Sequence, residues 1–126
     1  MKNVLILFFL LLGSQVFAQN EAGFFSAFKN GDITTMETYL EDNIDFCLFE
    51  DQQILNKKVA MTKLKSFLSS HKVNSVEVIH KGTSKDKSSQ YKVAKVTTAK
   101  DVFRVFVYTS GEIGAKTVKE IRIDKF

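Results

Sequence analysis

The sequence predicts an α+β domain in which helices near the N-terminus pack on one face of an antiparallel sheet. Over residues 24–40 and 61–68, apolar residues recur mostly every three or four positions, which is the period of a helix. After residue 71 they recur at every second position, in short segments separated by polar turns. Strands joined in sequence by short turns form an antiparallel meander, and the preceding helices are then left to cover one of its faces.

A secretory signal peptide is expected to precede this domain, over residues 1–18. Lys2 supplies a positive charge, residues 4–12 are uninterruptedly apolar, and a small-residue cleavage pattern ends at Ala18. The apolar run is shorter than the roughly 20 residues that span a membrane, although an uncleaved anchor is the alternative. We therefore expect one mature domain over residues 19–126, exported to the periplasm or secreted, with no transmembrane segment.

Three helices are expected in the mature domain. The first follows Asn20, a candidate N-cap, and ends at Gly31, while Asp32 can cap the second. Their apolar positions step by three and four residues: Phe24, Phe25, Phe28, Ile33, Met36 and Leu40. The third and longest helix is expected over residues 59–71, with an apolar stripe formed by Met61, Leu64, Phe67 and Leu68.

The alternating segments predict the strands. Residues 44–49 form the first, and residues 54–58 form a short returning strand ahead of the long helix. Four more follow, and the fifth strand of the chain, over residues 102–109, shows its two faces most clearly. Phe103, Val105 and Val107 share one face of this strand, opposite Val102, Arg104, Phe106 and Tyr108.

Charge and cysteine content limit the classes of partner. The net charge of +4 comes mainly from dispersed lysines, and Arg104 and Arg122 are the two arginines. This pattern argues against a nucleic-acid partner, which favours clustered arginine with exposed aromatic residues. Cys47 is the single cysteine, so it cannot form an internal disulfide, and we expect it to be a small buried residue.

Several short motifs carry a resemblance to a known family. They are Ala27-Phe28-Lys29-Asn30-Gly31-Asp32, Phe67-Leu68, His80-Lys81-Gly82 with Ser84, and Phe103-Arg104-Val105. With the order of elements, they make the chain similar to a family of small exported bacterial proteins known as a domain of unknown function. The resemblance implies a nuclear-transport-factor-2-like fold, a cone in which a long helix lies across a strongly curved sheet. The family has no established activity, and relatives with this cone include both enzymes and binding modules.

Asp45 and His80 are the candidate acid–base residues if the protein is an enzyme. Asp45 alternates with Ile44 on its strand, and His80 follows Val76 and Val78 at even spacing, so it is expected to point inward. An isomerase or dehydratase of this fold needs such a group inside the cone, with a tyrosine to stabilise an enolate oxygen. The structural alternatives are a solvated aspartate and a histidine that hydrogen-bonds at the end of a strand.

Tyr91, Arg104 and Tyr108 are the candidate ligand-binding residues, although each is also an ordinary residue for a strand. The two histidines and the lone cysteine lack the spacing of a metal site, and the sequence predicts no cofactor. We therefore expect a non-enzymatic domain that binds a small molecule or an envelope protein through the cone mouth. The alternative is an isomerase or dehydratase. A homodimer with face-to-face sheets is a further expectation from the resemblance.

Overall fold

The helices lie on one side of the sheet, as expected, in a computed structural model that describes residues 23–112 and 117–126. The expected signal peptide, its cleavage site and the Asn20 cap lie outside the described residues. Residues 23–30 form the first described helix. The remaining elements are α2 (Ile33–Thr38), β1 (Leu40–Leu48), β2 (Asp51–Asn56), α3 (Lys57–Ser70), β3 (Val73–Thr83), β4 (Ser89–Thr98), β5 (Val102–Ser110) and β6 (Thr117–Lys125).

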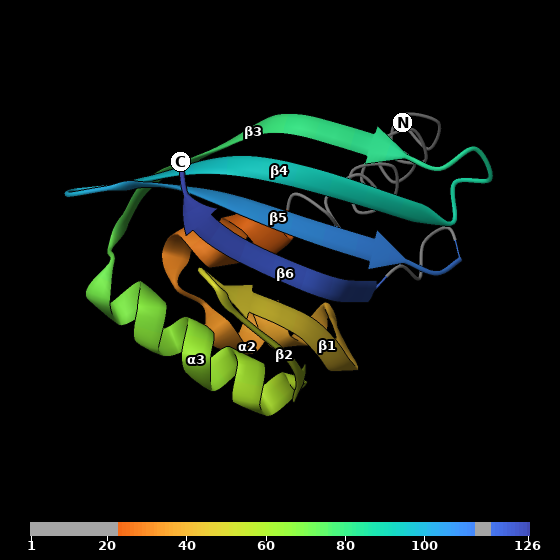
Figure 1. The fold of residues 1–126 in the computed structure, drawn as a ribbon, viewed down its shortest axis with the longest axis horizontal. Coiled ribbons are helices and arrows are strands. Elements are labelled where there is room, and N and C mark those ends of the chain that lie inside the picture. Colours follow the sequence, from red (N-terminus) through yellow and green to blue (C-terminus); the bar gives the residue numbers. More distant parts are fainter. Residues whose placement is uncertain (1–22, 113–116) are drawn as a thin grey trace, which may run out of the picture.

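The strands form one curled six-stranded sheet in the order β2-β1-β6-β5-β4-β3, and the helices cover its inner side (Figure 1). Four of its pairings are antiparallel, as predicted. The pairing of β1 with β6 is parallel, which the sequence did not predict. These two strands are neighbours in the sheet but lie far apart in the sequence. No tight turn joins them, so none dictates an antiparallel direction.

The face of the sheet toward the helices holds the core, and we call it the inner face. The predicted alternation of β5 is confirmed, and Phe103, Val105 and Val107 form the inner of its two faces, because all three are buried. They pack in one cluster with the helical residues Phe28 and Leu64. The opposite side of the sheet, which we call the outer face, is partly exposed.

Polar side chains fix the helix boundaries. Asp32 caps α2 by accepting hydrogen bonds from Thr35 Oγ1 and from Thr35 N, at 2.6 and 3.2 Å. The same two bonds, that of the hydroxyl first, lower the pKa of Asp32. Asn56 Oδ1 caps α3 by accepting a hydrogen bond from Lys58 N at 2.9 Å. Lys57 and Lys58 are therefore helical, whereas the sequence predicted them as the end of the returning strand. Leu40, expected in the second helix, instead begins β1.

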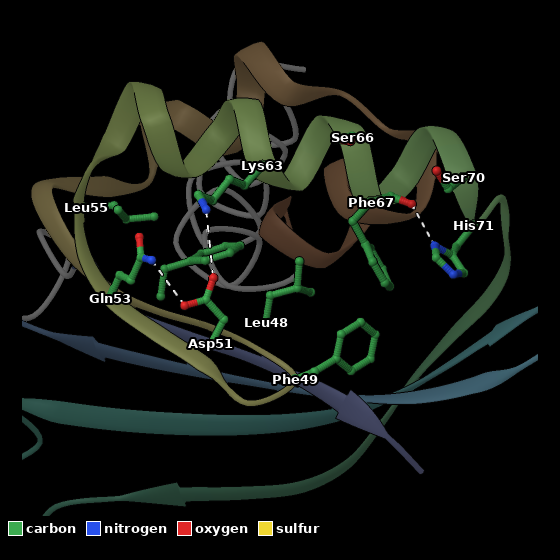
Figure 2. Close-up of a pocket in the computed structure, with 11 residues that line it drawn as sticks. Leu48, Phe49, Asp51, Gln53, Leu55, Lys63, Ser66, Phe67, Ser70 and His71 are labelled. Atoms are coloured by element: carbon green, nitrogen blue, oxygen red, sulfur yellow. Dashed lines mark hydrogen bonds and ion pairs between the residues drawn. The ribbon is translucent and has the colours of Figure 1, made fainter.

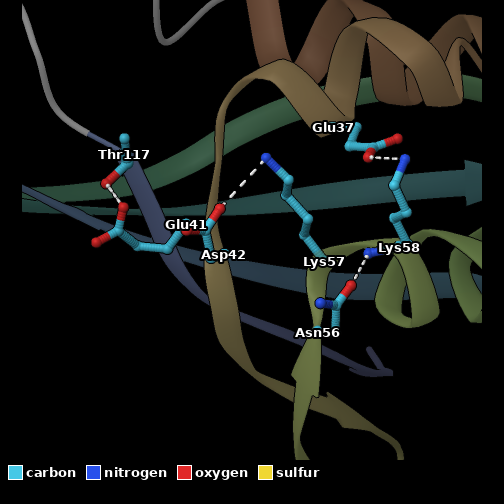
Figure 3. A network of polar contacts seen from close by, with 7 residues as sticks. All are labelled: Glu37, Glu41, Asp42, Asn56, Lys57, Lys58 and Thr117. Atoms are coloured by element: carbon cyan, nitrogen blue, oxygen red, sulfur yellow. Dashed lines mark hydrogen bonds and ion pairs between the residues drawn. The ribbon is translucent and has the colours of Figure 1, made fainter.

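Ion pairs join β1 to its neighbours in the fold (Figure 3). Lys57 Nζ lies 3.5 Å from Asp42 Oδ1 and connects α3 to this strand. On the other side, Glu41 accepts hydrogen bonds from Thr117 Oγ1 and Lys119 Nζ, both at 2.9 Å, where β6 begins. The contacts of Glu41 span the parallel pairing, which no turn supports.

We expect Glu41→Gln to lower the free energy of unfolding by about 0.5 kcal/mol at pH 7, because exposed ion pairs contribute little. The bonds from Lys119 and then Thr117 lower the pKa of Glu41 from its ordinary value of 4.5. The folded state thus favours the ionised form, and this stabilisation is lost as the pH falls through the lowered pKa. Urea titrations from pH 7 to pH 3 should show the two proteins converging in acid. Glu112→Gln, at an exposed turn, is the control, and a difference that persists at pH 3 contradicts this account.

Candidate functional site

A pocket of about 290 Å³ lies between α3 and the hairpin formed by β1 and β2 (Figure 2). We call it the α3 pocket. Eleven residues line it: Phe46, Leu48, Phe49, Asp51, Gln53, Leu55, Lys63, Ser66, Phe67, Ser70 and His71. Apolar side chains from the inner face of the hairpin form its floor, and most of its polar side chains come from α3 and the start of β2.

The lining residues from α3 and its C-cap form one stripe along the helix. They are Lys63, Ser66, Phe67, Ser70 and His71, spaced by three, one, three and one positions, which places them on one side of a helix. Phe67 is buried, whereas both serines of the stripe are exposed. The helix therefore presents a largely polar stripe to an apolar hairpin, and the space between them is not filled by side chains.

One end of the pocket is aromatic. The His71 ring stacks on the Phe67 ring at a centroid distance of 4.5 Å, and Phe49 meets Phe67 at 6.2 Å. Beneath them, Phe103 of β5 lies 5.1 Å from both the His71 and the Phe67 ring. His71 Nδ1 is 3.0 Å from Phe67 O. Because a carbonyl oxygen only accepts, Nδ1 carries a proton and donates it, which fixes the orientation of the imidazole ring.

Phe49 adopts a backbone conformation that is unusual for its residue type. It occupies the first position of the two-residue turn between β1 and β2, with φ of 59°. Hairpin turns of this length favour positive φ and usually place glycine or asparagine there. A bulky residue in this conformation costs about 1–2 kcal/mol. Its amide N–H donates to Ile123 O at 2.8 Å, and its side chain, 37% exposed, lies over the aromatic end of the pocket.

The other end of the pocket is charged. Lys63 Nζ lies 4.0 Å from Asp51 Oδ2, which joins α3 to β2 (Figure 2). Gln53 Nε2 donates to Asp51 Oδ1 at 3.1 Å. Both members of the ion pair are partly exposed, with 39% of the Lys63 side chain and 62% of the Asp51 side chain accessible to solvent. The pocket thus has an apolar floor, an aromatic end and a solvated charged end.

Asp45 lies on the outer face, away from the α3 pocket. Its two carboxylate oxygens accept from Gln52 Nε2, each at 3.1 Å. Its partner across the parallel pairing is Glu120. Burial raises the pKa of Glu120, and the neighbouring charge of Asp45 raises it further, while Arg122 opposes them. Asp45 therefore belongs to a polar cluster on the surface of the sheet.

His80 is exposed on the outer face as well, so the expectation that it points inward is wrong. Val76 and Val78 pair with Val96 and Ala94, which face inward, but the register shifts between Val78 and His80. This bulge brings His80 opposite Val93, on the outer face. A bulge inserts one residue and so reverses the alternation of side chains beyond it.

The candidate ligand-binding residues also share the outer face. Tyr91 pairs with Tyr108 across β4 and β5, and its ring stacks on Phe106 at 5.8 Å. It passes close over Gly82, where an added Cβ atom would collide with the Tyr91 ring. The Arg104 guanidinium lies 4.9 Å from the centre of the Phe126 ring. All three residues therefore lie on the outer face and outside the α3 pocket, but only Tyr91 and Tyr108 are neighbours, since Arg104 pairs with Lys95 further along the strands.

The described residues contain no cluster of three or more metal-ligating side chains, and no helix among them is long and apolar enough to cross a membrane. Cys47 is buried, as expected, and its thiol lies 3.1 Å from Phe49 O.

The residues that line the α3 pocket were not among the candidate site residues expected from the sequence. Lys63 and Ser66 lie outside the apolar stripe predicted for the long helix, and neither they nor His71 were candidate site residues. The sequence feature that could have revealed the pocket is the contrast between the polar stripe of the long helix and the apolar residues of the hairpin that precedes this helix in the sequence. Periodicity alone does not reveal that the stripe faces the hairpin, since this depends on how the helix is rotated against the sheet.

Comparison with known proteins places the chain in a family. Residues 22–124 match the model of the domain of unknown function DUF4783. A solved DUF4783 protein from Bacteroides uniformis is 30% identical, with a TM-score of 0.75 over 83% of this chain and 95% of that one. Another from Bacteroides ovatus is 26% identical, with a TM-score of 0.76 over 83% and 94%.

More distant structures agree on the fold. A nuclear-transport-factor-2-like (NTF2-like) protein from Cytophaga hutchinsonii is 14% identical, with a TM-score of 0.64 over 90% of this chain and 98% of that one. At this identity the likeness concerns the fold alone. No protein with curated information matches the chain. The chain therefore belongs to the DUF4783 family and has the NTF2-like α+β fold that its motifs and order of elements indicated.

Proposed function

We propose that this protein is a non-enzymatic binding domain for a small organic molecule, held in the α3 pocket. The observation that carries the proposal is the combination of an apolar floor, including Phe46, Leu48 and Leu55, with polar side chains along α3. Ligand pockets typically have this composition, with a few polar groups placed around an apolar interior.

The size of the pocket limits the ligand. At about 290 Å³ it is roughly twice the ~150 Å³ cavity that accommodates benzene in an engineered protein. It also falls near the lower end of the ~300–1,000 Å³ range of ligand pockets. A ligand with one or two rings and a polar group fits this volume.

The positions of the ionisable residues favour binding over catalysis. Asp45 and His80, on which the isomerase or dehydratase alternative depended, lie on the outer face. Asp51 and His71 do line the pocket, but they lie toward opposite ends of it (Figure 2). General acid–base catalysis requires such groups within hydrogen-bond reach of the same reacting centre. We therefore favour binding without chemistry.

Titration with indole, a neutral two-ring probe, tests the proposal. In ¹H–¹⁵N NMR spectra, indole is expected to shift the amide signals of α3 and of the β1–β2 hairpin. Ser66→Trp should abolish these shifts because the new ring fills the pocket. Ser69→Trp, an identical change at an exposed position of α3 that does not line the pocket, should preserve them. Absence of shifts in the unmodified protein, or shifts on the outer face alone, would contradict the proposal.

A second proposal, self-association, concerns the outer face. It carries the half-exposed rings of Phe106 and Tyr108 beside Tyr91, which is 41% exposed. The acidic pair of Asp45 and Glu120 lies on the β1–β6 side of these rings. Lys95 and Arg104 lie side by side on β4 and β5, and Glu77 and Asp124 flank them on β3 and β6. A second copy related by a two-fold axis would pack the aromatic rings against each other inside a rim of charges of both signs.

Light scattering coupled to size-exclusion chromatography measures this association. We expect a dimer that Tyr91→Arg converts to a monomer, because the change introduces a charge into the apolar centre of the interface. Val59→Arg is the control, since Val59 is 47% exposed on α3, away from the outer face. A monomer at all concentrations of the unmodified protein would exclude the dimer.

A further inference from the structure

Lys63 directs its ammonium group into the α3 pocket, toward Asp51 on the opposite wall (Figure 2). The separation of 4.0 Å between Nζ and Oδ2 exceeds the 2.7–3.2 Å of an N–H···O hydrogen bond. The two charges therefore attract each other across the charged end of the pocket without a hydrogen bond between them. Such an ion pair contributes little stability, so a ligand can replace it at small cost.

Asp51 is the member of this pair that can move away. Its side chain is 62% exposed, compared with 39% for Lys63, and it lies at the start of the edge strand β2. It already accepts a hydrogen bond from Gln53 Nε2, which can hold the carboxylate on the strand side. Lys63 is instead fixed to the helix that forms the opposite wall of the pocket.

The surroundings of Lys63 favour an anion. Helix α3 contains four lysines and no acidic residue. Two of them already pair outside the pocket, Lys57 with Asp42 and Lys58 with Glu37. Of the four, Lys63 alone lines the pocket. A cationic ligand would have to displace Lys63 from Asp51 and would then lie beside a positively charged helix. An anionic ligand is attracted both to Lys63 and to the other lysines of α3.

The aromatic end supplies the other half of the recognition. Phe49 and Phe67 offer ring faces and edges to an apolar body, and aromatic rings pack well against such groups. Phe49 keeps its strained backbone conformation, with positive φ, in the folded protein. A strained residue kept at a pocket suggests that its side chain serves the site.

Resting on the proposed function, we propose that the ligand of the α3 pocket is a small aromatic carboxylate. Its ring system lies against Phe49 and Phe67, and its carboxylate accepts a charge-assisted hydrogen bond from Lys63 Nζ, while the Asp51 carboxylate turns away toward Gln53. Phe49 and Lys63 are then the two residues that determine specificity, one for the ring and one for the charge.

Three probes of matched shape and different charge test this inference: 2-naphthoate, 2-naphthalenemethanol and 2-naphthylmethylammonium. Dissociation constants measured by NMR titration at pH 7 are expected to rise in that order, with naphthoate about tenfold tighter than the alcohol, the scale of one charge-assisted hydrogen bond. Lys63→Gln should remove this preference and its dependence on salt. Asp51→Asn should instead tighten naphthoate binding several-fold, because it removes the competing carboxylate.

Lys65→Gln is the matched control, since it removes the same charge from α3 at an exposed position that does not line the pocket. It should preserve the preference for naphthoate. Equal binding of all three probes in the pocket would overturn the carboxylate inference and leave the proposed function standing. Failure of both indole and the naphthalene probes to shift the pocket amides would overturn both. A preference for the ammonium probe would assign the recognition of charge to Asp51 and refute the role of Lys63.

Discussion

Phe103→Ala is expected to lower the free energy of unfolding by about 3–5 kcal/mol, the usual cost of removing a fully buried phenylalanine ring. Phe103 is 0% exposed, and its ring contacts Phe49, Phe67 and His71. Its loss leaves a cavity directly beneath the aromatic end of the α3 pocket. Chemical denaturation followed by circular dichroism measures the change. We also expect the probes of the pocket to bind less tightly, because the rings above Phe103 lose their support.

Phe106→Ala provides the control for this experiment on the same strand. Phe106 is three residues away on the outer face, where it is half-buried and stacks on Tyr91. Its truncation removes the same atoms but should cost clearly less than that of Phe103, and pocket binding should be unaffected. Equal losses of stability for the two variants would mean that the inner face does not carry the core as described.

At Phe49, alanine and glycine are expected to have different effects, although both remove the ring. We expect Phe49→Ala to lower the free energy of unfolding by about 2 kcal/mol, because it loses the ring contacts and retains a positive φ. Phe49→Gly should lower it by only about 1 kcal/mol, because glycine adopts positive φ without a steric penalty. Thermal and urea denaturation of the two variants measure the difference.

The same pair of variants separates backbone strain from ligand binding. Both lack the ring over the pocket, so both should bind 2-naphthoate more weakly than the unmodified protein, and to the same extent. An alanine variant as stable as the glycine variant would show that position 49 carries no strain. Unchanged binding in both would remove Phe49 from the recognition of the ring.

The comparison of Phe49 with Phe103 shows which parts of the site the sequence can predict. Phe103 lies in a regular strand, so alternation groups it with Val105 and Val107 on one face, and their burial shows that this face is the inner one. Phe49 was predicted as the last residue of an alternating segment, but it lies in the hairpin turn after β1. A phenylalanine carries no turn signal of its own, because glycine and asparagine usually mark such positions.

His80 and Asp45 show a second limit. The alternation of Val76 and Val78 was interpreted correctly, since both pair with inward-facing residues of β4. A single inserted residue then turned His80 to the outer face, and a bulge leaves no reliable mark in one sequence. Asp45 follows the predicted alternation with Ile44, and that places it on the outer face beside Glu120.

By itself, the sequence determined the fold class, the order of most elements and the apolar faces of its helices and strands. These properties follow from local periods of apolar residues, which act along the chain within a few positions. The tertiary structure alone decided the parallel pairing of β1 with β6, the outward turn of His80 and the α3 pocket. Each of these depends on segments far apart in the sequence, or on the rotation of a helix against a sheet. Many arrangements of such segments bury the same apolar residues, so the local pattern does not select among them.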